Sequence, residues 1–404
     1  MSTSLLYHGF NIVGYQHVSE NFQGGQVIFR IEQRRDRLRC PDCGCDEVWV
    51  RGHIERTFRT LPIGSKPAWV TLDVARVWCP VCDTVRQVKI GFADPKKRYT
   101  RSFQRYALEL SRHMTIKDVA KHLQVSWDTI KEIQANSLQR RFGKPKLHKL
   151  QQIAIDEIAI GKGHHYLTVV LNLVSGAVVF VGDGKGTEAL ENFWKRLRRA
   201  RAKIQAVATD MSSAYIRAVR DNLPMAVHVF DHFHVIKLFN EKLSAFRREL
   251  YHQADSDRER RILKGTRWLL LKNPENLDEG RNELDRLLAA LQLNQPLAIA
   301  YYLKEDLRQI WSQPNKQTAR RVLRDWQARA RASGIRMLVQ FAATLEEHEV
   351  GILNYYDYRI STGPLEGTNT KIQLMKRQAY GFRDQAFFKL KILGIHETKH
   401  ALVG

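Results

Sequence analysis

Hydrophobic and polar positions alternate along the first part of the chain, as they do in half-buried β-strands. Segments 26–31 and 68–74 show this period of two and are rich in β-branched and aromatic residues, with Gly and Pro between them. From about Ser102 the apolar positions recur at helical spacing instead. The pattern therefore predicts a β-rich N-terminal region followed by helices.

A second block of β-forming segments begins near residue 152 and alternates with helical segments. Its order is β-β-β-α-β-α-β, which predicts a mixed sheet with helical crossovers. From about Val235 to Tyr355 the pattern indicates almost only helix, and a last helix is expected from Pro364 onward. The expected strands of the second block are 152–156, 166–171, 177–181, 206–210 and 226–230, with a helix over 188–202.

Composition adds a strong charge to this picture. The chain has 404 residues, 44% of them hydrophobic, and a formal net charge of +23. It shows no apolar run of the ~20 residues that a membrane span needs, and its start lacks the features of a secretory signal. We therefore expect an intracellular, cytoplasmic protein with a polyanionic partner, most simply nucleic acid. A merely soluble basic enzyme is the alternative.

Four of the five cysteines form two C-P-x-C pairs, Cys40 with Cys43 and Cys79 with Cys82. Two such turns can complete a tetrahedral zinc site, so we expect one structural Zn²⁺ with no open position for chemistry. A redox role is the alternative, although no thioredoxin-like context supports it. Cys45 is expected to be a free thiol, and replacement of Cys43 as a zinc ligand is the alternative. Arginines surround the pairs, as expected for a ribbon that contacts phosphates: Arg34, Arg35, Arg37, Arg39, Arg51, Arg56 and Arg59.

Residues 115–133 have the pattern of a helix-turn-helix. Thr115 is placed to cap the first helix with Asp118 as its acidic partner, and Ser126 to cap the second. Trp127 and Lys131 lie early in that second helix, where a recognition helix contacts DNA. An ordinary helical hairpin is the alternative.

Three carboxylates are candidates for a catalytic metal site. Asp156 and Asp210 each follow a short apolar run, so both are expected at ends of neighbouring strands. Glu366 and Asn369 share one face of the helix that begins near Pro364. Carboxylates so arranged bind magnesium or manganese, and two ions can serve in-line phosphoryl transfer. Other acidic residues compete for these roles: Glu157, Asp183 and Asp231.

Two further patterns do not carry a site. The segment 182–187 is similar to a phosphate-binding loop, but Gly186 stands where Ser or Thr is required. The adjacent pair His164 and His165 point to opposite faces if they lie on a strand. We expect these histidines at the surface or in contact with DNA.

Taken in order, these motifs resemble the ISL3 family of bacterial insertion-sequence transposases. The resemblance covers nearly the whole chain, and also includes 231–235 and the basic run 376–383. It implies a multidomain α+β protein: a zinc ribbon (1–92), a helix-turn-helix domain (93–149), and an RNase-H-like mixed α/β core (150–235 and 351–404). An all-helical insertion (236–350) interrupts the core and explains the long separation of Asp210 and Glu366.

The resemblance also implies a function. The family's catalytic triad carries over to Asp156, Asp210 and Glu366, which would hold two Mg²⁺ (or Mn²⁺) ions. The chain would be a DDE transposase that binds terminal inverted repeats, cuts the strand and joins it to target DNA. Asn172 and the segment 182–185 depart from the family's pattern without touching the triad. Expected DNA contacts are Arg56, Trp127, Lys131, His234, Asn369, Lys371, Lys376, Arg377 and Arg383. For His234 a place in the core or at a helix cap is the alternative, and for the four basic residues after Asn369 a merely solvated helix face.

Two other functions stay open on the sequence. One is a non-catalytic, sequence-specific DNA-binding regulator derived from a transposase. The other is an RNase-H-like nuclease that cuts without joining. The expected partners are double-stranded DNA and a second copy of the chain in a homodimer, with no small-molecule substrate and no membrane. The expected location is the bacterial nucleoid. DNA binding that weakens steeply with salt is also expected.

Overall fold

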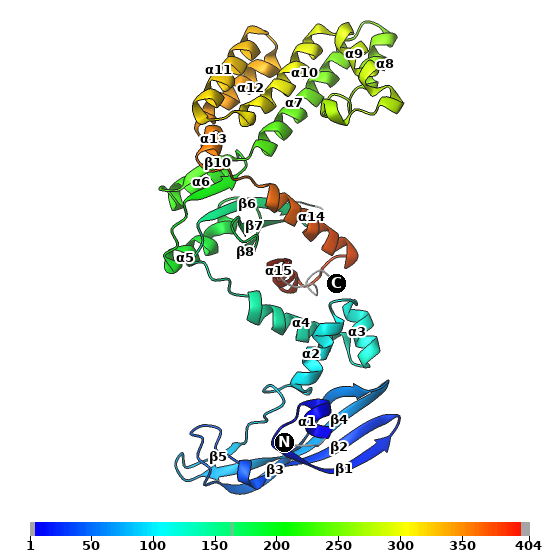
Figure 1. Cartoon of the computed structure of the whole chain (residues 1–404), viewed down its shortest axis with the longest axis vertical. Helices are drawn as coiled ribbons and strands as arrows, with labels where there is room; N and C mark the ends of the chain where they lie inside the picture. Colours follow the sequence, from blue (N-terminus) through cyan, green and yellow to red (C-terminus); the bar gives the residue numbers. More distant parts are fainter. Residues whose placement is uncertain (1–4, 162, 164, 397–404) are drawn as a thin grey trace. The chain divides into compact units, whose positions relative to one another are not determined.

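The computed structural model describes residues 5–161, 163 and 165–396 (Figure 1). It divides into two compact units, Met1–Lys144 with Met375–Gly404, and Pro145–Leu374. His164 and the last part of the expected basic C-terminal segment, 397–404, lie outside the described residues. No helix in the described part is long and apolar enough to cross a membrane.

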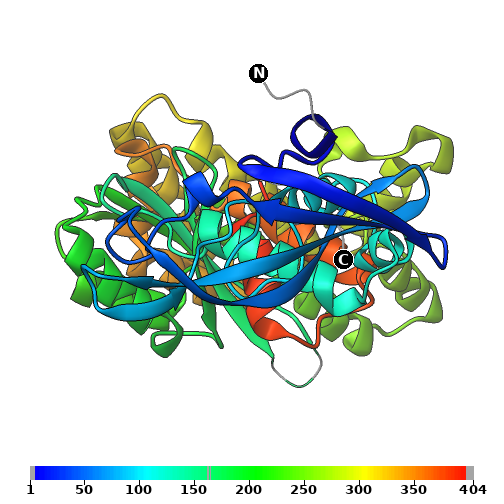
Figure 2. The same cartoon turned by 90° about the horizontal axis from the view of Figure 1, so that it is seen from below.

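The first unit contains a twisted sheet in the order β1-β2-β4-β3, with β5 beside β4. Only β2 and β4 pair in parallel. The long strands lie side by side in Figure 2. Alternate residues such as Phe58, Val70 and Leu72 are fully buried, which confirms the predicted β-rich start. The elements are α1 (Leu5–Phe10), β1 (Tyr15–Gln23), β2 (Gln26–Gln33), η1 (Arg35–Arg37), β3 (Trp49–Ile63), β4 (Lys66–Cys79) and β5 (Thr84–Gln87).

Several helices follow the sheet in the described part of this unit. They are α2 (Arg101–Leu110), α3 (Ile116–Leu123), α4 (Trp127–Phe142) and α15 (Gln385–Leu393). The Thr115 side chain accepts a hydrogen bond from the backbone N–H of Asp118, and the Ser126 side chain accepts one from that of Thr129, as the capping pattern predicts. Gln124 adopts a left-handed conformation (φ 53°) between α3 and α4 and makes the turn.

A buried arginine connects the sheet to the helices. Arg59 is 3% exposed and donates to the carbonyl of Ala68 in β4 (3.0 Å) and to that of Leu123 in α3 (2.9 Å). The second contact lies at the negative end of the α3 dipole, where a cation is stabilising. Arg59 therefore holds the helix-turn-helix against the ribbon rather than facing solvent.

The second unit is built on a five-stranded sheet in the order β10-β9-β6-β7-β8. Strands β6, β7 and β8 are antiparallel, whereas β9 and β10 join them in parallel. The predicted order of strands and helices is confirmed. Its elements are β6 (Gln152–Ala159), β7 (Tyr166–Asn172), β8 (Val178–Asp183), η2 (Glu188–Leu190), α5 (Glu191–Ala200), β9 (Ala206–Thr209), α6 (Ser213–Asn222) and β10 (Val227–Phe230).

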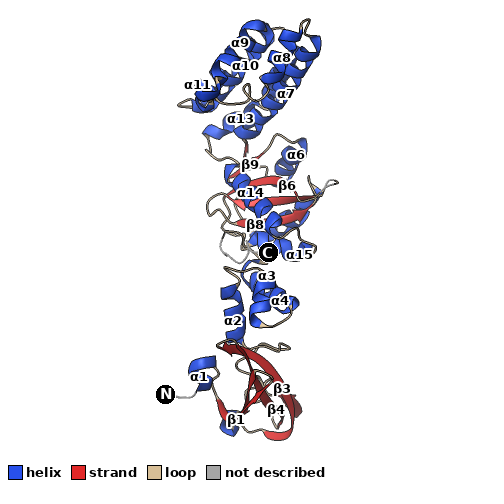
Figure 3. Cartoon of the chain, turned by 90° about the vertical axis from the view of Figure 1, so that its right-hand side faces the viewer, coloured by secondary structure: helices blue, strands red, loops and turns tan. Residues whose placement is uncertain are grey.

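A helical segment separates β10 from the last helix of this unit (Figure 3). Its core includes Phe239, Trp326 and Phe341, whose ring centroids lie 4.9–6.0 Å apart. The elements are α7 (His232–Gln253), α8 (Asp257–Gly265), η3 (Pro274–Asn276), η4 (Glu279–Arg281), α9 (Glu283–Leu293), α10 (Gln295–Arg308), η5 (Gln309–Ser312), α11 (Lys316–Ala332), α12 (Arg336–Glu347), α13 (Glu349–Leu353) and η6 (Asn354–Tyr356).

The chain then returns to the sheet at β10. The Asn354 side chain donates to the carbonyl of His228 (2.9 Å). Gly351 packs on the ring of Phe230 so closely that an added Cβ would lie 2.4 Å from it, which explains the glycine. Beyond these contacts the chain enters α14 (Gly363–Gln378), the helix that carries Glu366.

Candidate active site and cysteine cluster

Strand pairing places Asp156 and Asp210 on the same face of the second sheet. Strands β6 and β9 are parallel neighbours with Ala154 opposite Ala208. Two residues further along each chain come Asp156 and Asp210, so the pleat turns both side chains to the same side. One expectation was wrong: Asp156 lies inside β6 rather than at its end, because pairing with β7 continues to Ala159. Asp210 directly follows β9, as expected.

Helix α14, which carries Glu366, is joined to β6 by two side-chain hydrogen bonds. The Asn369 side chain donates to Oδ2 of Asp156 (2.9 Å), and the Gln373 side chain donates to the carbonyl of Ala159 (2.6 Å). Positions 366, 369 and 373 share one face of the helix. Two hydrogen bonds therefore hold this face along β6, with Glu366 one turn before Asn369.

Burial changes the acidity of the central carboxylate. Burial raises the pKa of Asp156 to about 6, and the nearby charge of Asp210 acts in the same direction, whereas His234 lowers it. The backbone N–H of Ser212 donates to Oδ1 of Asp210 (2.9 Å), which orients that side chain. Negative charges forced together in a partly dry site are the usual setting of a cation site.

A second acidic group lies next to Glu366. Asp231 caps α7 and accepts a hydrogen bond from the Thr362 hydroxyl. Burial alone would raise its pKa, but the hydrogen bond from Thr362 and the nearby His232 and His234 side chains outweigh burial and lower it. His234 Nε2 lies 4.0 Å from Glu366 Oε1. Ligand atoms of Asp231, His234 and Glu366 all lie within 4.8 Å of one another.

The acidic competitors have other partners in the structure. Glu157 accepts a hydrogen bond from the Tyr215 hydroxyl (2.9 Å). Asp183 is exposed at the end of β8. Asp231 is fully buried as a helix cap and connects α7 to the turn before α14. Glu157 and Asp231 thus have structural partners near the triad, and Asp183 lies on the surface.

The donor set around Asp156 fits divalent cations. Carboxylate and amide oxygens are the ligands that magnesium and manganese prefer. Among the described residues, the buried Oδ1 of Asn369 and Nε2 of His234 have no hydrogen-bond partner. An orphaned acceptor beside clustered carboxylates is expected where a cation completes the site.

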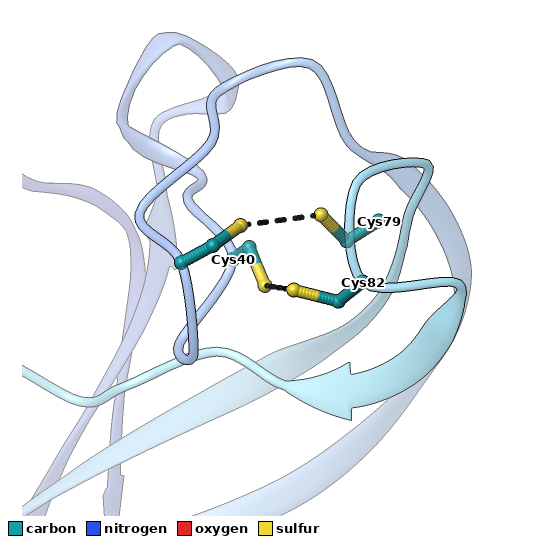
Figure 4. Close-up of side chains that lie close together, drawn as sticks. Cys40, Cys79 and Cys82 are labelled. Carbon is teal, nitrogen blue, oxygen red and sulfur yellow. Dashed lines mark hydrogen bonds between the residues drawn. The ribbon is translucent and has the colours of Figure 1, made fainter.

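The four paired cysteines meet at one point of the first unit (Figure 4). Sulfur separations are 3.9 Å for Cys40–Cys82 and 3.5 Å for Cys43–Cys79. Tetrahedral zinc with Zn–S bonds of ~2.3 Å requires about 3.8 Å between sulfurs. Backbone N–H groups of Cys43 and Asp42 lower the pKa of the Cys40 thiol to about 7. The cluster is thus compatible with zinc; Cys45 is outside it and contacts the Glu47 carbonyl.

The expected DNA contacts in the first unit differ in their surroundings. Trp127 is 46% exposed at the start of α4. Lys131 instead forms an ion pair with Asp384 (2.8 Å) and lies over the rings of Trp127 and Phe387. Arg56 donates to the carbonyl of Lys97 (3.0 Å). Thus Trp127 is open to a ligand, whereas Lys131 and Arg56 have intramolecular partners.

The remaining expected contacts follow the triad helix or lie inside the site. His234 and Asn369 belong to the site itself, with Asn369 bonded to Asp156. The later basic side chains are exposed or partly exposed: Lys371, Lys376, Arg377 and Arg383.

Three residues that orient the site were not predicted from the sequence. They are Ser212, Thr362 and Gln373. Gln373 carried a usable signal, since it follows Asn369 by one helical turn and so lies on the same face. Ser212 and Thr362 act through a backbone N–H and a long-range hydroxyl contact, which no sequence spacing shows.

Comparison with known proteins identifies the same regions. Residues 153–392 match the transposase family of the ISL3 type, and residues 88–136 match the helix-turn-helix domain of transposase family ISL3. A structure titled Drosophila P element transposase strand transfer complex is 12% identical, with a TM-score of 0.35 over 74% of this chain and 92% of that one.

Two curated relatives cover most of the chain. The transposase for insertion sequence element IS1001 of Bordetella parapertussis is 34% identical over 87% of both chains. The transposase for insertion sequence element IS1557 of Mycobacterium tuberculosis is 30% identical over 94% of this chain and 91% of the relative. With the matched helix-turn-helix and transposase regions, this similarity shows that the chain belongs to the ISL3 family of insertion-sequence transposases.

Proposed function

We propose that this transposase binds the terminal inverted repeats of its insertion sequence and carries out metal-dependent strand cleavage and strand transfer. The observation that carries the proposal is the hydrogen bond from Asn369 to Asp156, which joins the helix of Glu366 to strand β6. Strand register aligns the two aspartates, and the Asn369–Asp156 hydrogen bond holds the helix of Glu366 beside them. The Mg²⁺ or Mn²⁺ ions that these carboxylates would bind supply charge stabilisation for phosphoryl transfer.

The protein's own groups have separate tasks in this proposal. Asp156, Asp210 and Glu366 hold cations and, through them, the scissile phosphate. Asn369 and Ser212 fix the orientation of Asp156 and Asp210, respectively. In this proposal His234, whose Nε2 lies 4.0 Å from Glu366 Oε1, contacts the DNA at the cut. No side chain is required to form a covalent intermediate.

The first unit would bind the ends of the element. The exposed N-terminal part of α4, with Trp127, is suited to the DNA groove. One Zn²⁺ held by Cys40, Cys43, Cys79 and Cys82 would stabilise the ribbon. Because two element ends must be joined, we propose a homodimer that acts on the chromosome in the bacterial cytoplasm. The five-part domain division given above remains part of this proposal.

The decisive experiment measures cleavage and joining of a duplex that carries the element's terminal repeat, with Mg²⁺ present. The wild type should yield nicked and joined products, and Asp156→Asn, Asp210→Asn and Glu366→Gln should yield neither. Glu157→Gln is the matched control and should retain activity, because its carboxylate contacts Tyr215. Equal products from wild type and Asp156→Asn would refute the catalytic assignment.

The same assay distinguishes the alternatives. Specific binding of the terminal repeat with no cleavage by the wild type would indicate a regulator. Cleavage without joining, where a related transposase joins its own ends, would indicate a nuclease.

A further inference from the structure

A large groove opens beside Glu366 on the helical segment of the second unit. Its volume is about 910 Å³, and Glu366 forms part of its wall. One face of α7 forms its floor, from Phe233 through Lys237 to Arg248. At 1.5 Å per residue this face is about 22 Å long. The groove therefore leads from the triad along the insertion.

Aromatic side chains lie at the end of the groove near the triad. His232 lies at the centre of this group, with ring centroids 4.2 Å from Phe233, 5.8 Å from Trp311 and 5.9 Å from Tyr355. Phe233 is 49% exposed although it is large and apolar. The indole N–H of Trp311 is buried and has no hydrogen-bond partner among the described residues. The group thus offers the open ring of Phe233 and the partly exposed rings of His232, Trp311 and Tyr355 to the groove.

Cations line the groove further from the triad. Lys237, Arg248 and Arg267 are all exposed. In the part of the chain that the structure describes, Lys237 and Arg248 form no ion pair with a carboxylate, and the guanidinium of Arg267 lies over Trp268 (4.7 Å). This excess of positive charge continues away from the acidic triad, as a path for a phosphate backbone would.

We propose that this groove binds unpaired nucleotides of the DNA strand next to the cut. Aromatic faces stack on bases whose own faces are free, and bases inside a duplex already stack on each other. Cations along the same groove then hold the phosphates of that strand. This inference rests on the proposed function for the position of the cut, and it adds a single-stranded binding site to the duplex contacts proposed above.

The test compares DNA ends in a binding assay without chemistry. Full-length protein carrying Asp156→Asn, with Ca²⁺ in place of Mg²⁺, is titrated with a terminal-repeat duplex that is blunt or carries a short 5′ or 3′ overhang. The first unpaired base is 2-aminopurine, whose fluorescence falls when it stacks on an aromatic ring. We expect at least one overhang to bind about tenfold or more tightly than the blunt end, with quenching, since base–aromatic stacking contributes about 1–3 kcal/mol.

Substitutions identify the groove as the cause. Trp311→Ala and Phe233→Ala should each remove most of the quenching and of the overhang preference, while Trp311→Phe should keep them. Phe233→Ala alters an exposed ring, so it tests the groove even if Trp311→Ala does not fold. Tyr302→Ala is the matched control, because Tyr302 is 55% exposed on α10 and does not line the groove.

Several outcomes would overturn the proposal. The proposal is wrong if neither overhang binds more tightly than the blunt end. It is also wrong if the quenching persists in both alanine variants. If the groove variants weaken blunt and overhanging DNA equally, the groove holds duplex phosphates instead. The binding assay needs no cleavage, so its result is independent of the cleavage assay. If the wild type never cuts its terminal repeats but the overhang preference is found, the transposition chemistry is refuted and the groove assignment stands.

Discussion

At the scale of single residues, the buried carboxylate of Asp156 lowers the stability of the metal-free folded protein, although the same carboxylate is suited to binding a cation. Its carboxylate is largely buried, and burial raises its pKa to about 6, from an ordinary value near 4. The folded protein therefore holds the proton of Asp156 more tightly than the unfolded chain does. Stability consequently falls as the pH rises from about 4 to about 6, and the full cost persists above that.

We predict that Asp156→Asn abolishes cleavage yet raises the thermal stability of the metal-free protein at pH 7 to 8. The gain should be on the order of 2 kcal/mol, because the uncharged amide avoids the desolvation cost of the carboxylate. Thermal unfolding with EDTA, followed over pH, measures it. The gain should shrink toward pH 4, where Asp156 is protonated in both states. A variant less stable than the wild type at pH 8 would contradict this account.

At the scale of elements, α15 completes the helix-turn-helix from the opposite end of the sequence. Phe387, Phe388 and Ile392 of α15 are at most 5% exposed, and Phe387 belongs to the hydrophobic core of these helices. Gly394 allows the chain to pass close to Leu138 and Phe142 of α4. Asp384 holds Lys131 of the predicted recognition helix. The DNA-binding helices thus depend on residues far outside the segment that carries their sequence pattern.

We predict that Phe387→Ala weakens DNA binding although residue 387 touches no DNA in our proposal. Truncating a buried Phe costs about 3–5 kcal/mol, and here the loss falls on the core that supports α4. Thermal unfolding and a DNA-binding titration measure both effects. Tyr380→Ala is the control, since Tyr380 is fully exposed. Unchanged DNA affinity and stability in Phe387→Ala would show that α15 is dispensable.

Loss of zinc should destabilise the ribbon in the first unit. We predict that Cys82→Ser loses the bound metal and destabilises the first unit, because four thiolates are needed to close a structural site. Cys45→Ser should retain one zinc per chain, since Cys45 lies outside the cluster. Metal analysis of the purified variants measures this. Loss of zinc from Cys45→Ser, or its retention by Cys82→Ser, would contradict the ligand assignment.

Local pattern predicted those elements whose side chains alternate or whose ends are capped by nearby residues. The order of strands and helices along the second unit, the caps at Thr115 and Ser126 and the cysteine cluster belong to this group. The length of β6 was missed because Asp156 and Glu157 interrupt its apolar run, and only pairing with β7 continues the strand. The role of α15 was missed because its contacts to α4 are set by tertiary packing rather than by sequence spacing.

At the scale of the whole molecule, the first unit is formed by both ends of the chain and the second by the segment between them. The acidic triad lies in the second unit, while the chain as a whole carries a net charge of +23. A basic protein with a few clustered acidic residues attracts the DNA backbone over a wide surface, and its acidic residues still offer a place for cations at the cut. Affinity for DNA should then depend mainly on phosphate contacts.

We therefore predict a steep loss of DNA affinity with salt, with a slope of log K against log [NaCl] on the order of −5 to −10. Each phosphate contact adds about one to the slope, so Arg383→Gln, which removes an exposed cation after the triad helix, should make it shallower by about one. Arg324→Gln is the matched control, because Arg324 pairs with Glu349 on the insertion. Titrations over a range of NaCl concentrations measure the slopes. If DNA affinity hardly depends on salt, or if the slope changes equally in both variants, the positive charge does not serve to bind DNA phosphates.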